Sequence, residues 1–133
     1  MLLTKKTLPA LRKLTRSQRL QRAEEFRSVL QNRVTFTGNY LRLHIKPNHS
    51  DFARLGLIVA KRIEHKAVRR NRIKRIVRET FRLQQQTISG LDCVIQLRNP
   101  VDTSTNYVSL RPEALMLLAR AEGYLQKYAA ITD

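Results

Sequence analysis

The sequence is poor in several residue types, and each scarcity argues against a class of protein. Its 133 residues contain one cysteine, Cys93, and no tryptophan. A single cysteine cannot form an internal disulfide, which fits a reducing compartment. Four glycines form no glycine-rich phosphate loop. The three histidines, His44, His49 and His65, lack the spacing of metal ligands.

Long apolar runs are also absent. No run approaches the ~20 residues that a membrane-spanning helix needs. The amino terminus, Met1-Leu2-Leu3, is followed at once by Lys5 and Lys6, so it contains no signal-peptide core. We therefore expect a cytoplasmic protein that has no membrane partner.

Acidic residues are also few. Ten Asp or Glu residues stand against 26 Lys or Arg residues, and the net charge is +16. The acids are scattered, and the adjacent Glu24 and Glu25 diverge on a helix, so they form no catalytic pair. We therefore predict no catalytic residue and no metal site. The excess of positive charge instead predicts a polyanionic partner, which for a soluble chain is usually a nucleic acid.

Length and composition predict one domain. A chain of this length with 42% apolar residues can form a single hydrophobic core. Residues 1–18 carry charge and Pro9 but little periodicity, and we expect a flexible basic extension there. We expect a single RNA-binding domain over residues 19–128 and a short tail over residues 129–133.

Hydrophobic periodicity predicts an α+β fold. Helices are expected over about 21–31, 67–85 and 110–128, and strands over about 35–46, 54–61 and 92–98. Pro112 falls in the first turn of the last helix, whose expected core positions are Leu115, Leu118, Ala121 and Leu125. The order is α-β-β-α-β-α with room for one extra short strand. It describes one small sheet with helices packed against it.

Half of the net charge lies in residues 61–82. This segment, KRIEHKAVRRNRIKRIVRETFR, has ten Lys or Arg residues against Glu64 and Glu79, which leaves +8. On a helix, one side gathers Ile73, Ile76, Val77, Thr80 and Phe81, and the other gathers Asn71, Lys74, Arg75, Arg78 and Arg82. A face kept for solubility normally mixes both signs. The pattern therefore favours a surface that binds phosphates.

A second group of residues suits single-stranded RNA. In the segment 35–46, Leu41, Leu43 and Ile45 point one way, and Tyr40, Arg42, His44 and Lys46 point the other way. Together with Phe26 they supply cations and aromatic rings, the combination that holds single-stranded RNA. Two alternatives stay open, because Phe26 can be a core residue and Tyr40 can pack on neighbouring strands.

Two adjoining segments resemble a known family. Residues 54–62, RLGLIVAKR, and the helix with Ala67-Val68, Arg70-Asn71-Arg72 and Lys74-Arg75 closely resemble the signature of the bacterial ribonuclease P protein subunit. The resemblance extends upstream to Arg19-Leu20 and Glu25-Phe26 and covers roughly residues 19–98.

This resemblance implies a fold and a function. The family folds as an α/β sandwich of the ribosomal protein S5 domain 2 type, with an unusual left-handed β–α–β crossover. Its partners are the large ribonuclease P RNA and the 5′ leader of precursor tRNA. The RNA cuts off the leader with magnesium ions, and the protein is a non-catalytic subunit that binds no cofactor alone. No further protein partner is expected.

The resemblance also suggests two sets of site residues. The ribozyme RNA would face Lys61, Arg62, Arg70, Asn71, Arg72, Lys74, Arg75 and Arg78. The leader cleft would contain Phe26, Leu30, Tyr40, Arg42 and His44. Phe26 matches the family's cleft aromatic, whereas Leu30 stands where the family often has a second aromatic. Tyr40, Arg42 and His44 are assigned by strand parity.

Two other functions are weighed against this one. A structural RNA-binding protein of the ribosomal type would share the charge and the fold, but the signature in residues 61–82 argues against it. A stand-alone protein endonuclease would need clustered acids, which the sequence lacks.

Overall fold

The computed structural model describes residues 14–101 and 104–132 of the chain. It contains η1 (Arg16–Gln18), α2 (Ala23–Gln31), β1 (Val34–Thr37), β2 (Leu41–Pro47), β3 (Arg54–Ile58), α3 (Ala67–Gln84), β4 (Leu91–Leu97) and α4 (Ser104–Thr132). The predicted α+β order is confirmed, and β1 is the extra short strand.

The four strands form one sheet in the order β1-β2-β4-β3. β2 lies antiparallel to both β1 and β4, whereas β3 lies parallel to β4. Because α3 joins the parallel neighbours β3 and β4, the three elements form the expected β–α–β crossover. Its left-handed sense stays a prediction from the family resemblance.

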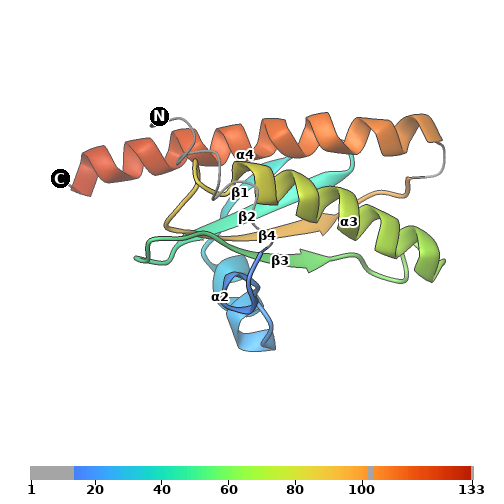
Figure 1. Ribbon diagram of the computed structural model, residues 1–133, viewed down its shortest axis with the longest axis horizontal. Coiled ribbons are helices and arrows are strands. Elements are labelled where there is room, and N and C mark those ends of the chain that lie inside the picture. Colours follow the sequence, from blue (N-terminus) through green and yellow to red (C-terminus); the bar gives the residue numbers. More distant parts are fainter. Residues whose placement is uncertain (1–13, 102–103, 133) are drawn as a thin grey trace, which may run out of the picture.

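Helices cover both faces of the sheet (Figure 1), with α3 and α4 on one face and α2 on the other. The alternation predicted for residues 41–46 explains this layering. Leu41, Leu43 and Ile45 are buried in the main core beneath α3 and α4. On the opposite face, Val94 of β4 packs with Leu20 and Val29 in a smaller cluster beneath α2. The sheet therefore separates two cores of unequal size.

The single strand predicted over residues 35–46 is instead the hairpin of β1 and β2. The chain turns at Gly38, whose N–H donates to the carbonyl of Leu41 at 2.8 Å. The carboxylate of Glu113 in α4 accepts the N–H groups of Asn39 (3.0 Å), Tyr40 (2.8 Å) and Leu41 (2.6 Å). Pattern analysis missed this turn because its stabilising group lies more than 70 residues away in the sequence.

The strand predicted over residues 54–61 ends earlier, at Ile58. The close approach expected at Gly56 is confirmed. A Cβ atom at Gly56 would lie 2.5 Å from Cε2 of Phe26, so any larger residue would collide with that ring. The absence of a side chain at Gly56 thus allows Phe26 of α2 to pack directly against β3.

The last helix is longer than predicted at both ends. α4 begins at Ser104, so Pro112 lies inside the helix and not in its first turn. An interior proline costs about 3 kcal/mol. The additional turns bury Tyr107, which offsets part of this cost because burying a large side chain contributes about 1.5–3 kcal/mol. At the other end the helix continues through Thr132, so residues 129–132 form no separate tail.

The core stripe of α4 also differs from the prediction at one position. Leu118 and Ala121 are buried and Leu125 is partly buried against the core, as expected. Leu115 is half-buried, and Leu117 occupies the core in its place. No helix in the described ranges is long and apolar enough to cross a membrane.

The folded domain begins before residue 19. Leu14 is 6% exposed and belongs to the main core. The side chain of Gln18 donates to the Gln85 side chain at 2.6 Å, and the N–H of Leu20 donates to the carbonyl of Leu55 at 2.9 Å. Residues 14–18 are therefore part of the domain, and the rest of the predicted extension, residues 1–13, lies outside the described residues.

Candidate nucleic-acid interface

α3 separates its apolar and basic side chains as the sequence predicts. Ile73, Val77 and Phe81 are buried in the main core. Thr80 is buried as well, and its hydroxyl donates to the carbonyl of Ile76 at 2.8 Å. On the other side, Asn71 and Arg75 are exposed, and Lys74 and Arg78 are half-buried. One face of α3 is therefore fixed to the sheet, and the other presents cations.

The two acids in this segment are both bonded to neighbouring groups. Glu64 is 6% exposed, and its carboxylate accepts the N–H of Lys66 at 3.1 Å. Glu79 forms an ion pair with Arg82, and the hydrogen bond from Arg82 lowers the pKa of Glu79. With both acids engaged locally, the charge that α3 and its preceding loop present is strongly positive.

Not all of the predicted RNA-facing residues are presented in the same way. Lys61 and Arg62 are exposed in the loop before α3. Arg72 is exposed, with its guanidinium 4.3 Å from the centre of the Tyr107 ring. Arg70 is half-buried and turns back to donate to two carbonyls of the preceding loop. Both arginines of the Arg70-Asn71-Arg72 triplet thus contact other parts of the protein.

A small cavity connects the basic helix to the other face of the domain. It has a volume of about 180 Å³ and lies between α3, β3 and the segment before α2. Arg19, Lys74 and Arg78 bring positive charge to it, and Phe26 and Gly56 contribute apolar walls. Burial, and then the charge of Arg19, lower the pKa of Arg78. Three cations without an acid in the cavity lining are an arrangement that favours an anionic ligand.

Four of the five predicted cleft residues lie on the α2 side of the sheet. Phe26 and Leu30 are half-buried against the cluster of Leu20, Val29 and Val94. Arg42 and His44 extend from the same face of β2, and the imidazole Nε2 of His44 lies 3.0 Å from the Gln96 side-chain oxygen. The predicted sharing of one face by α2 and β2 is therefore found for these four.

Tyr40 does not join this group. It lies in the turn before β2, where strand parity no longer holds, and it packs against the main core beneath α3 and α4. The parity argument that assigned it to the leader cleft fails, because parity applies only within a continuous strand. A role for Tyr40 in the cleft stays a prediction.

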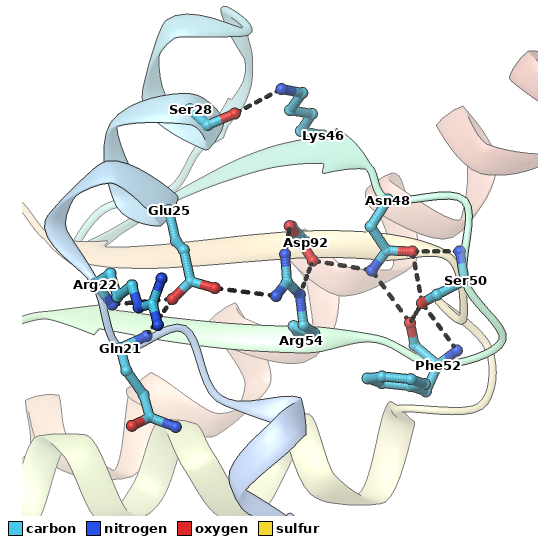
Figure 2. Close-up of polar contacts among 10 residues, drawn as sticks. All are labelled: Gln21, Arg22, Glu25, Ser28, Lys46, Asn48, Ser50, Phe52, Arg54 and Asp92. Carbon is cyan, nitrogen blue, oxygen red and sulfur yellow. Dashed lines mark hydrogen bonds and ion pairs between the residues drawn. The ribbon is translucent and has the colours of Figure 1, made fainter.

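A network of charged side chains fixes α2 to the sheet (Figure 2). The guanidinium of Arg54 donates to both carboxylate oxygens of Asp92, at 2.7 and 2.6 Å, and to Glu25 at 3.1 Å. The other oxygen of Glu25 accepts the backbone N–H groups of Gln21 and Arg22, both at 2.9 Å. These N–H bonds, and more weakly Arg54, lower the pKa of Glu25. The start of α2 is thereby joined to β3 and β4.

A second contact and a loop complete this arrangement. Lys46 of β2 donates to the hydroxyl of Ser28 at 2.5 Å, and this hydrogen bond joins β2 to α2. Asn48 donates to Asp92 at 2.9 Å and accepts the N–H of Ser50 at 2.9 Å. The loop between β2 and β3 is therefore fixed to the same buried acid as α2.

Sequence reasoning missed a larger hollow beside this network. It has a volume of about 710 Å³, and its lining includes Arg16, Arg19, Arg22 and Arg54. These arginines lie in η1, in an extended segment, at the cap of α2 and at the start of β3, so no periodic pattern connects them. The four arginines are brought to one hollow by the tertiary structure alone.

Other chemistry finds little support in the described residues. Within those ranges, no three His, Cys, Asp or Glu side chains are grouped as a metal site would require. Cys93 is fully buried in β4, and burial raises the pKa of its thiol, which keeps it protonated. Cation-lined hollows and a basic helix on an α+β sandwich define a small single-domain protein suited to binding nucleic acid.

Comparisons with known proteins identify the family. The sequence matches the ribonuclease P family over residues 14–122. It is 54% identical over 108 residues to the ribonuclease P protein component of Nitrosomonas europaea, a match that covers 81% of this chain and 90% of that one. The corresponding protein of Azoarcus sp. is 38% identical over 104 residues, with 78% and 86% covered.

Solved structures agree. The ribonuclease P protein of Thermotoga maritima resembles this chain with a TM-score of 0.67 and 30% identity, covering 77% of this chain and 96% of that one. The Staphylococcus aureus protein gives a TM-score of 0.70 at 24% identity over 78% and 94% of the two chains, a likeness of fold alone. The chain therefore belongs to the ribonuclease P protein family. Its role is that of a protein component of ribonuclease P, in line with processing of tRNA 5′ ends.

The buried histidine of the cleft predicts a pH dependence of stability. Burial lowers the pKa of His44 from 6.5, the hydrogen bond with Gln96 partly offsets this, and Arg42 adds to the lowering. Because the unfolded chain binds the proton more readily, the folded state loses stability as pH falls from about 6.5 toward the lower folded-state pKa. We expect His44→Gln to remove this loss in urea unfolding experiments between pH 7.5 and 5.

The exposed His65 supplies the matched control. His65→Gln replaces a histidine that is exposed in the loop before α3 and is measured in the same way. Equal pH dependence in His44→Gln and the native chain would show that His44 does not titrate differently on folding.

Proposed function

We propose that this chain acts in ribonuclease P by binding the catalytic RNA through α3 and the loop before it. The observation that carries this proposal is the basic surface on which Lys61, Arg62 and Arg75 are exposed. Glu64 is buried, and Glu79 is paired with Arg82. The like charges on such a surface repel one another unless a polyanion neutralises them. Folded RNA supplies closely spaced phosphates that can do so.

We further propose that the 5′ leader of precursor tRNA lies along the α2 side of the sheet. Phe26, Arg42 and His44 border this side, and the cavity lined by Arg19 and Arg78 adjoins Phe26. Cations beside an aromatic ring suit single-stranded RNA of varied sequence, because every base has a face that can stack. Leu30 would give apolar contact only.

Phosphodiester cleavage is proposed to reside in the RNA, with magnesium ions that the RNA holds. The described residues offer no cluster of acids for a two-metal nuclease site, which supports this division of labour. A ribosomal-type structural role is the alternative, and co-purification with a single RNA of the cognate ribonuclease P type would argue against it. We propose that the protein acts in the cytoplasm, because its one cysteine is a free thiol buried in the core, which fits a reducing compartment.

Removal of one exposed charge tests the RNA-binding surface. Arg75→Ala should weaken binding to ribonuclease P RNA, and the slope of log affinity against log salt should fall by roughly one, because one phosphate contact is lost. The matched control is Arg120→Ala, an exposed arginine on α4. Unchanged affinity and slope for Arg75→Ala would place the RNA on another surface.

Replacement of the cleft aromatic tests the leader site. Phe26→Leu keeps apolar contact with Gly56 and removes the stacking face. Affinity for precursor tRNA should fall by about 1–3 kcal/mol if a base stacks there, with mature tRNA binding unaffected. A thermal melt of each variant is the control. A lower melting temperature with equal losses for both tRNAs would make Phe26 purely a packing residue.

The charge of the chain predicts how magnesium affects its contribution. The protein should speed precursor-tRNA cleavage most at low magnesium, because its +16 reduces the repulsion between two RNAs. The advantage should shrink as magnesium rises, when rates with and without protein are compared at subsaturating substrate. A constant advantage across the range would indicate a protein group that acts in the chemistry itself.

A further inference from the structure

The loop over residues 61–66, between β3 and α3, carries a compact group of cations. Lys61, Arg62 and Lys66 are all exposed. The acid of this loop, Glu64, is buried and uses its carboxylate on the N–H of Lys66. Three like charges in six residues repel one another, so a fixed conformation of this loop needs bonds that oppose its opening.

Part of that support is local. The N–H groups of Ile63 and Glu64 both donate to the carbonyl of Ala60, at 3.1 and 3.0 Å, and form a tight turn. Ile63 is also partly buried against the main core. These contacts hold the first half of the loop and leave the second half, up to the start of α3, to be held by other groups.

Arg70 supplies that second support from the first turn of α3. Its Nη1 donates to the carbonyl of Glu64 at 3.1 Å and to the carbonyl of His65 at 2.9 Å. Hydrogen bonds from a charged group are stronger than neutral ones, and the carbonyl dipoles stabilise the guanidinium among the other cations. Arg70 is half-buried in this position, whereas Arg75 on the same helix is exposed.

We infer that Arg70 is a positioning residue, which holds the loop 61–66 so that its cations meet the RNA in a fixed arrangement. This inference rests on the proposed function and changes one part of what the family resemblance implies, since Arg70 acts through the loop and not as a phosphate ligand. A preformed loop lowers the conformational entropy lost on binding, and this raises affinity without a new contact.

The first experiment uses the free protein, so that its outcome does not depend on RNA binding. Amide hydrogen exchange is measured at Lys66, in the half of the loop that Arg70 holds, and at Ile63, in the half held by Ala60. The native chain, Arg70→Ala and the matched control Arg75→Ala are compared at Lys66. Loss of two charge-assisted hydrogen bonds should speed exchange in Arg70→Ala by about tenfold or more, with little change in Arg75→Ala. Unchanged exchange in β4 shows that the variants are folded.

The second experiment measures affinity for the cognate ribonuclease P RNA in a double-mutant cycle. The double substitution Lys61→Ala, Arg62→Ala is made in the native chain, in Arg70→Ala and in Arg75→Ala. If Arg70 positions the loop, the loss caused by removing these cations should be at least about threefold smaller in Arg70→Ala, because they are already misplaced. In Arg75→Ala, removing Lys61 and Arg62 should lower the affinity by the same factor as in the native chain, because the effects are independent.

Three outcomes would overturn the inference. Native exchange rates in the loop of Arg70→Ala would show that Arg70 does not hold it. Faster exchange combined with independent losses in the cycle would show that the order of the loop does not serve RNA binding. If no variant changes RNA affinity, including Arg75→Ala, the proposed RNA surface fails together with the role of Arg70, while the exchange data still report the loop.

Discussion

The ion pair between Arg54 and Asp92 is the interaction on which the functional arrangement depends. It joins the parallel strands β3 and β4 in register, and through Glu25 it also fixes the start of α2. Asp92 is the buried partner of this pair, so removing Arg54 would leave its carboxylate buried and unpaired, which is destabilising. Without this network, α2 would lose its orientation over the sheet. Phe26 would then lose its place against Gly56, and the cavity of about 180 Å³ that both residues line would lose a wall.

A second constraint is the net charge of +16, which the fold distributes unevenly. Four of the acids make hydrogen bonds that hold the fold together. Asp92 and Glu25 neutralise Arg54, Glu113 caps the hairpin turn, and Glu64 caps the approach to α3. In the described part of the chain, Lys61, Arg62 and Arg75 are among the cations exposed on the surface. The stability of the folded chain and its affinity for a polyanion are thus linked, because phosphates relieve the repulsion that folding concentrates.

Much of the site could be predicted from sequence, for an identifiable reason. α3 is long and strongly periodic, so its core residues such as Ile73 and its exposed residues such as Arg75 follow from helical geometry alone. The same holds for the two faces of β2, which placed Arg42 and His44 on one side. Strand parity failed for Tyr40, which lies just outside the strand. Periodicity also could not place Arg19 or Arg54 beside the hollows on this side, because these residues lie in separate short segments.

The sequence by itself determined the α+β class, the single domain, the basic helix and the family, because these depend on composition, periodicity and local motifs. Tertiary structure decided the rest. The hairpin turn is held by Glu113 from a distant helix, and the helix boundary at Ser104 depends on burial of Tyr107. Whether Arg70 points to solvent or back to its own loop depends on two carbonyls whose positions exist only in the fold. Hydrogen bonds from side chains to backbone carbonyls leave no periodic trace in a sequence, and here those bonds determine which way Arg70 points.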